Sequence, residues 1–152
     1  MRIHFIGSIG VITRDRAVGR RFFVEALGLP LESAEGSDFL FTEKLSGSRY
    51  FGVWPLSEAA KACFGTDRWP KDHPVPQVFV EFEVGSPRSV ASAVSELESK
   101  GYTMLTRPRR DPWGQTVARL QTADGIIVGI SYVPWMHRRA RPKARRARIS
   151  RR

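Results

Sequence analysis

The chain contains an internal repeat, in which the order of helix and strand signals in the first half returns in the second half. Ser8 corresponds to Phe79, an offset of 71 residues, and Gly52 corresponds to Gly129, an offset of 77 residues. A repeat of this kind is typical of two copies of one supersecondary unit that pack together. No other feature of the sequence restricts the fold as strongly.

The first half predicts one strand, one helix and three further strands. Residues 3–13 form an apolar run that is typical of a buried strand, and Asp15 is a good N-cap for the helix that follows. Gly28 ends this helix. Turn signals then separate three predicted strands at residues 31–35, 38–44 and 48–55. The apolar positions of the helix keep helical spacing and are Val18, Phe22, Phe23, Ala26 and Leu27.

The second half repeats this order. Residues 77–84 alternate as a strand, and Ser86 followed by Pro87 predicts the start of a helix that ends at Gly101. Three more strands are predicted at residues 103–107, 115–121 and 126–132. The predicted class is α+β, with two tandem βαβββ modules at residues 1–56 and 77–134. A connector with a short helix is expected at residues 57–76, and a flexible basic tail at residues 135–152.

The net charge of +10 is a property of the C-terminal segment. Between Arg138 and Arg152 there are nine Lys or Arg residues and no acid, so the rest of the chain has 16 basic and 15 acidic residues. Because clustered arginines release counterions from phosphate, contact with nucleic acid or another polyanion through this segment is one hypothesis. The segment has no aromatic residue for stacking on bases, which favours a merely solvated tail.

Cysteine usage and hydropathy favour a soluble cytoplasmic protein. Cys63 is the single cysteine, so it has no partner for an internal disulfide, and its apolar neighbours favour a buried helical residue over a nucleophile. The longest apolar stretch, residues 125–136, is too short to span a bilayer. The N-terminal apolar run lacks a small-x-small cleavage site and is interpreted as a strand. We therefore expect no membrane partner.

Three short motifs lie at defined places in the repeat. They are Ala26-Leu27-Gly28-Leu29-Pro30 after the first helix, Asp111-Pro112-Trp113-Gly114-Gln115 before the penultimate strand, and Ala123-Asp124-Gly125 before the last strand. With the order of elements, they resemble the glyoxalase, bleomycin-resistance and extradiol-dioxygenase superfamily, also called vicinal oxygen chelate, over residues 3–134. The resemblance implies curved mixed sheets around a shared cup, a homodimer, and in the enzymes a divalent metal held by His, Glu or Gln.

The positions that the resemblance assigns to metal ligands carry no imidazole or carboxylate. They correspond to Ser8, Gly52, Phe79 and Gly129, and a shift by one residue adds only glycine and apolar side chains. His4, His73 and His137 are interpreted as surface or turn residues. We therefore expect no metal and no cofactor, and none of the usual lyase, isomerase or ring-cleaving dioxygenase chemistry of the family.

Strand alternation predicts which side chains face the cup. On residues 77–84, the apolar set from Val78 to Val84 should pack against the helices, which directs Phe79, Glu81 and Glu83 to the opposite face. The same alternation directs Glu43 and Val117 inward. The expected ligand-binding residues are Phe39, Phe41, Tyr50, Trp54, Phe79, Glu81, Trp113, Gln115 and Arg119.

This lining favours a metal-free protein that binds a small, aromatic molecule, because aromatic walls give stacking area and a few polar groups fix orientation. One alternative is a metal-independent or atypical-metal enzyme of the same superfamily, with Glu81 as the candidate catalytic base. A second is a polyanion-binding module that acts through the basic tail. The aromatic residues are also consistent with an ordinary filled core, in which Arg119 pairs with Glu81 for structural reasons only.

Overall fold

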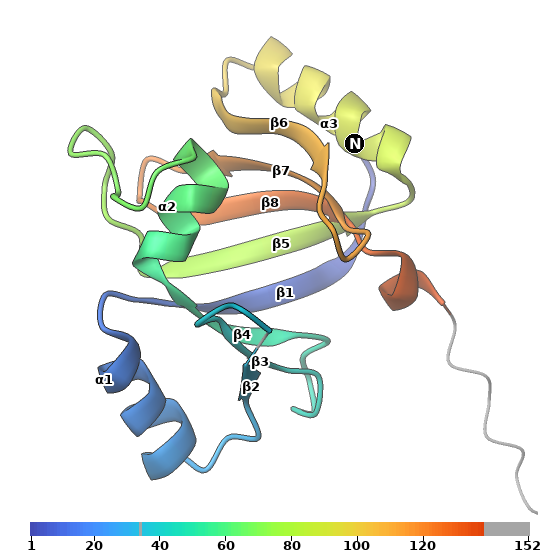
Figure 1. Cartoon of the computed structure of the whole chain (residues 1–152). Coiled ribbons are helices and arrows are strands. Elements are labelled where there is room, and N and C mark those ends of the chain that lie inside the picture. The colour runs from blue at the N-terminus through green and yellow to red at the C-terminus, as the bar shows by residue number, and fades with distance from the viewer. Residues whose placement is uncertain (34, 139–152) are drawn as a thin grey trace, which may run out of the picture.

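The repeat folds into one continuous eight-stranded sheet in the computed structural model, which describes residues 1–33 and 35–138 (Figure 1). The first half contains β1 (Ile3–Thr13), α1 (Arg16–Arg20), a π-helical turn η1 (Arg21–Ala26), β2 (Glu32–Ser33), β3 (Leu40–Thr42) and β4 (Phe51–Pro55). The second half contains β5 (Val78–Val84), α3 (Pro87–Ser99), β6 (Met104–Arg110), β7 (Thr116–Gln121) and β8 (Ile127–Tyr132). The predicted order of strand, helix and three strands is therefore confirmed in both halves. Helix α2 (Leu56–Phe64) connects the halves, and a short 3-10 helix, η2 (Pro134–His137), follows β8.

The two halves join through their first strands. The strand order is β2-β3-β4-β1-β5-β8-β7-β6, and β1 pairs with β5 in antiparallel orientation. Ser8 lies opposite Glu81, and Gly10 lies opposite Phe79. Each of these strands also pairs in parallel with the last strand of its own half, β4 or β8. The free edges of two four-stranded halves thus satisfy each other's backbone hydrogen bonds.

Local capping starts the first and third helices where the sequence predicts. The Asp15 carboxylate accepts hydrogen bonds from the backbone amides of Ala17, at 2.7 Å, and Val18, at 3.1 Å. Ser86 Oγ accepts from the Ser89 amide at 3.1 Å. Both caps satisfy amides that have no partner within the helix.

Helix α3 covers the outer face of the second half of the sheet. Its buried residues Val90, Ala93 and Val94 pack with Val84 of β5 and Ile130 of β8. The alternation that placed Val84 on the helix-packing face is thereby confirmed at this end of β5. Val78, at the other end of the strand, is 37% exposed, because α3 packs against the Val84 end.

The apolar stripe of the first predicted helix is largely exposed. It runs from α1 through η1, where Val18, Phe22 and Leu27 are each more than half exposed, and Gly19 is the one buried residue of α1. Figure 1 shows α1 projecting from the lower edge of the sheet. The spacing of apolar residues indicates a helix with one apolar face, but it does not determine whether another element covers that face.

The strands of the first half are also shorter than predicted. Strand β2 has two residues and β3 has three, and they share only two residue pairs.

No helix among the described residues has the length and apolar character needed to cross a bilayer. Most of the predicted basic tail, residues 139–152, lies outside the described residues.

Candidate functional site

The face of the sheet opposite α3 holds a cavity of about 460 Å³. Its lining comes from β1, β3, β4, β5, β7 and the segments between them. The cavity contradicts the interpretation in which aromatic residues fill the cup completely. Eight of the nine expected ligand-binding residues line it, namely Phe39, Phe41, Tyr50, Trp54, Phe79, Glu81, Trp113 and Arg119.

Three aromatic rings with nearly parallel planes form one wall of this cavity. The ring planes of Phe39, Phe41 and Tyr50 lie within 6° to 17° of one another, with centroids 5.2 to 6.2 Å apart. Trp54 meets Phe79 edge-to-face at a centroid distance of 5.3 Å. Burial raises the pKa of the Tyr50 phenol, and the nearby carboxylates Glu81 and Glu43 raise it further, so its hydroxyl remains a neutral donor. The wall offers a planar ligand a stacking surface.

Gly52 and Gly129 leave space for two side chains that line the cavity, Phe39 and Glu81, which form its floor. A Cβ atom at Gly52 would lie 2.6 Å from the ring of Phe39, and one at Gly129 would lie 2.8 Å from Cγ of Glu81. These two glycines occupy positions that the resemblance assigns to metal ligands. The side chains of Phe39 and Glu81 therefore occupy the space into which a metal-binding side chain at either glycine would extend.

Glu81 is the centre of a buried polar network. Arg119 Nη2 donates to Glu81 Oε1 at 3.1 Å, and Gln115 Nε2 donates to Glu81 Oε2 at 2.9 Å. The same Gln115 nitrogen donates to Ser131 Oγ, and Trp113 Nε1 donates to Gln115 Oε1, each at 2.9 Å. Gln115, expected to contact a ligand, does not line the cavity and hydrogen-bonds to Glu81, which does. Trp113 is 59% exposed and stands at the rim.

Part of this network has no protein partner. The Nε and Nη1 atoms of Arg119 and the Oδ2 atom of Asp111 are buried without a hydrogen bond. Burial raises the pKa of Asp111, an effect opposed by the positive charges of Arg119 and Arg109. The Arg119 guanidinium also lies 5.4 Å from the ring centroid of Trp54. A buried guanidinium with spare donors is a group that water or a bound ligand can satisfy.

The short helix η2 closes one side of the cavity through Trp135 and Met136. Glu83, which is fully buried, accepts hydrogen bonds at Oε2 from the Val133 amide, at 2.7 Å, and contacts His137 Nε2 at 2.9 Å. Arg49 Nη1 donates to the carbonyl oxygen of Met136 at 2.9 Å. His137 lies in a helical turn, as the sequence predicts for a surface or turn residue, and its ring in addition contacts a buried carboxylate.

Sequence reasoning missed η2 because strand alternation says nothing about a turn that follows the last strand. One signal was available, since an inward-facing Glu83 needs a partner once it is buried. Val117, also directed inward, is fully buried and does not line the cavity. Further lining residues that alternation did not identify are Ser8, Glu35, Ser37 and Glu58.

The carboxylates around the cavity outnumber its basic groups. Of residues 1–33 and 35–138, those with charged side chains that line it are Glu35, Glu43, Glu58, Glu81 and one cation, Arg119. Glu58, from the first turn of α2, accepts from Ser37 Oγ and from the Asp38 amide, both at 2.6 Å. Glu43 accepts from Trp135 Nε1 at 3.3 Å. The cavity therefore has an acidic, aromatic character.

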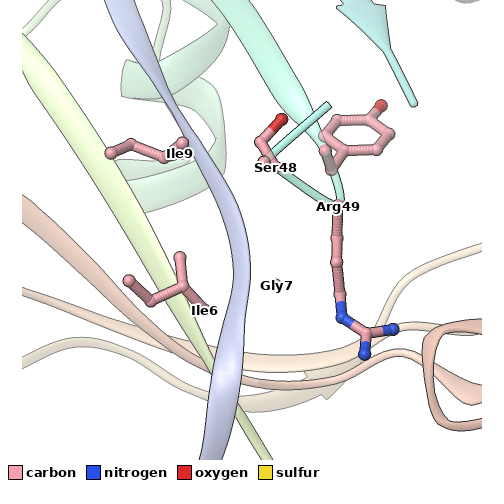
Figure 2. Close-up of a pocket in the computed structure, with 7 residues that line it drawn as sticks. Ile6, Gly7, Ile9, Ser48 and Arg49 are labelled. Atoms are coloured by element: carbon pink, nitrogen blue, oxygen red, sulfur yellow. The ribbon is translucent and has the colours of Figure 1, made fainter. Parts of the chain in front are cut away.

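A second hollow, of about 630 Å³, lies beside β1. Figure 2 shows Ile6 and Ile9 on one side of the β1 ribbon and Ser48 and Arg49 on the other. The gap arises because β4 pairs with β1 only from Ile9 onward. The Arg49 guanidinium already lies 4.0 Å from the centroid of Phe5 and donates to Met136. With a single aromatic residue in its lining, Tyr50, this hollow is a weaker candidate than the cup.

The profile of the Glyoxalase/Bleomycin resistance protein/Dioxygenase superfamily matches residues 5–130. The chain belongs to this superfamily. The match covers both βαβββ modules and confirms the family that the sequence motifs resemble. No curated protein matches the chain.

Solved structures agree with the superfamily fold. A glyoxalase/bleomycin resistance protein/dioxygenase superfamily member from Vibrio splendidus 12B01 is 16% identical, has a TM-score of 0.52, and covers 83% of this chain and 97% of its own. A protein described as NAD-dependent benzaldehyde dehydrogenase from Legionella pneumophila is 15% identical, with a TM-score of 0.53 and the same coverage. Methylmalonyl-CoA epimerase from Streptomyces coelicolor is 18% identical, with a TM-score of 0.52, covering 88% and 99%. At these identities the likeness shows the fold alone.

The residues present do not fit the divalent metal that enzymes of the superfamily hold. Among residues 1–33 and 35–138, no three His, Cys, Asp or Glu side chains lie close enough together to bind a metal ion. Glu81 lies at the junction of the two halves, opposite Ser8, and both of its oxygens accept hydrogen bonds within the protein. The positive charge of Arg119, 3.1 Å away, further opposes a cation at this position.

Proposed function

We propose that this superfamily member binds a small, aromatic molecule in the cup without using a divalent metal. The observation that carries the proposal is the enclosure of one cavity by seven aromatic side chains above a buried polar network. They are Phe39, Phe41, Tyr50, Trp54, Phe79, Trp113 and Trp135. A cavity of about 460 Å³ falls within the range of small-molecule sites.

The shape and charge of the lining restrict the ligand further. The parallel rings of Phe39, Phe41 and Tyr50 favour a planar group that stacks on them. Four carboxylates against one guanidinium favour a neutral or cationic molecule over an anionic one. Aromatic faces attract cations as well, so a planar cation gains from both features.

Binding of two planar dyes of opposite charge tests this proposal. We expect the full chain to bind thioflavin T, which is cationic, more tightly than the anionic dye 1-anilinonaphthalene-8-sulfonate, as measured by dye fluorescence. Phe41→Ala should weaken thioflavin T binding by about tenfold, because one face of the stacking wall is lost. Phe22→Ala is the matched control, since Phe22 is exposed on η1 and does not line the cavity.

The metal-free part of the proposal has its own measurement. Dialysis against EDTA should leave dye affinity unchanged, and added Zn²⁺, Mn²⁺ or Ni²⁺ should not raise the melting temperature. Loss of binding after EDTA treatment would contradict a metal-free site. Equal dye affinity in the Phe41→Ala, Phe22→Ala and unmodified proteins would contradict binding in the cup.

A second candidate function is catalysis with Glu81 as general base. The observation that favours it is the position of a carboxylate, 7% exposed, in the lining of an aromatic cavity. Against it, each oxygen of Glu81 already accepts one hydrogen bond, from Arg119 or from Gln115, so a substrate proton can approach only the remaining lone pairs. If a turnover reaction is found, Glu81→Gln should abolish it while dye binding persists. Turnover that survives this substitution would contradict the role of Glu81.

A further inference from the structure

The chain leaves the described structure at the edge of the acidic, aromatic cavity. Trp135 and Met136 line the cavity, and the described residues end two positions later, at Arg138. The 14 residues that follow contain seven Arg, one Lys and no acid. A strongly basic segment therefore begins beside a cavity lined by four carboxylates.

The charges of the segment and the cavity are complementary. Of the charged side chains in the lining, the one cation, Arg119, is already paired with Glu81. Glu35 and Glu43 are exposed, so their charges face the solvent. Glu43 also contacts Trp135, three residues before the end of the described chain. An attraction between unlike charges therefore acts where the segment starts.

Arginine suits this lining better than a simple point charge would. A planar guanidinium stacks on aromatic faces and at the same time donates several hydrogen bonds to carboxylates. Arg119 already does so, since it lies 5.4 Å from the centroid of Trp54 and donates to Glu81. Arg49 shows the stacking alone, 4.0 Å from the centroid of Phe5. The same contacts are open to an arginine that enters the cavity from the segment.

We propose that residues 139–152 are an internal occupant of the cavity, with an arginine side chain bound between the aromatic wall and the carboxylates. This occupant competes with an external cationic ligand, so the proposal deepens the proposed function and rests on it for the competition. Fourteen residues span at most about 46 Å when extended, which exceeds the width of the cup. A tether this short holds the segment at an effective concentration of about 1 mM, so even weak intrinsic affinity suffices.

The first experiment measures competition in the full chain. In the test variant, the eight basic residues of the segment are replaced by glutamine: R139Q, R141Q, K143Q, R145Q, R146Q, R148Q, R151Q and R152Q. This variant should bind thioflavin T about fivefold more tightly than the unmodified chain at low ionic strength, and the difference should vanish at about 0.5 M salt. Equal affinities of the two proteins at low salt would overturn the competition.

A paired substitution locates the effect in the cavity. Neutralising the segment should raise dye affinity by a smaller factor in the Glu43→Gln protein than in the protein that keeps Glu43. The reason is that Glu43 contributes part of the attraction between the segment and the cavity. Glu25→Gln is the matched control, since Glu25 is exposed on η1 and does not line the cavity. Equal behaviour of the Glu43 and Glu25 variants would overturn an occupant bound at the cup.

A second readout does not depend on any dye. A synthetic peptide of residues 139–152, added to the neutral-segment variant, should change the fluorescence of the cavity tryptophans Trp54, Trp113 and Trp135 in a saturable, salt-sensitive manner. This result supports the internal occupant even if no dye binds, which separates it from failure of the proposed function. No peptide effect, with dye binding intact, would overturn the inference alone. Salt-dependent oligonucleotide binding that requires the basic residues, without any peptide effect, would replace it with a polyanion-binding role.

Discussion

Arg119 and Glu81 form a buried ion pair across the cup, with Nη2 of the arginine 3.1 Å from Oε1 of the glutamate. Their side chains are 6% and 10% exposed. The pair joins β7 to β5, and Gln115 donates a hydrogen bond to the other oxygen of the Glu81 carboxylate. The two residues therefore pair with each other and also line the cavity, and Arg119 keeps two nitrogens without a hydrogen bond among the described residues.

Removing one member of this pair should cost more than removing both. Arg119→Met leaves the Glu81 carboxylate buried with one donor fewer, and we expect the free energy of unfolding to fall by about 3 kcal/mol. The double variant with Glu81→Gln should be more stable than Arg119→Met alone, because no buried charge remains. Urea denaturation of the four proteins of this cycle measures the difference. Strictly additive effects of the two substitutions would contradict the pairing.

The glycines of the floor should differ in their tolerance of a methyl group. A Cβ at Gly10 would lie 2.1 Å from the carbonyl oxygen of Gly52, so β1 and β4 must separate, and Gly10→Ala should cost about 3 kcal/mol or more. At Gly129 the obstacle is Cγ of the Glu81 side chain, which can shift only by disturbing its hydrogen bonds to Arg119 and Gln115, so Gly129→Ala should cost about 2 kcal/mol and displace that carboxylate. Thermal unfolding compares the two. A larger loss for Gly129→Ala would show that the explanation is wrong.

The contact between His137 and Glu83 should hold η2 against the cavity. His137→Ala should lower stability by about 1 kcal/mol and shift the emission of Trp135 to longer wavelength, because the short helix loses one of its anchors. Tryptophan fluorescence and dye affinity measure the change. His73→Ala is the control, since His73 packs on Phe64 in the connector, away from η2. An unchanged spectrum for His137→Ala would contradict the anchoring role.

Cys63 should be unreactive at moderately alkaline pH. Burial on α2 raises the pKa of its thiol to about 11, so the folded protein binds this proton more tightly than the unfolded chain does. The associated stability is fully present below pH 9 and is lost as pH rises towards 11. Cys63→Ala should therefore lose less stability than the unmodified chain over this interval, as followed by urea denaturation. Rapid alkylation of the folded protein by iodoacetamide at pH 8 would contradict the assignment.

Two predictions from the sequence concern binding partners, and both remain predictions. Homodimerisation is implied by the superfamily resemblance, and sedimentation of the full chain measures it. Contact of the segment from Arg138 to Arg152 with a polyanion is an outcome of the experiments on the basic segment above.

The sequence by itself determines the features that depend on near neighbours. The caps at Asp15 and Ser86 form as predicted, because each satisfies amides two or three residues away. The alternation of β5 places Phe79 and Glu81 on the same face, because successive side chains of a strand point to opposite sides. The order of elements and the superfamily follow from such local signals repeated in the two halves.

The tertiary structure alone decides how these faces meet. Pairing of β1 with β5 brings Ser8 opposite Glu81, and the return of the chain after β8 brings His137 to Glu83, a contact across 54 positions. The apolar stripe that includes Phe22 remains exposed, although its spacing matches that of a buried helix. Local patterns encode which side of an element is apolar or polar, whereas the identity of what covers that side depends on long-range packing. The cup, its ion pair and its closing wall are products of that packing.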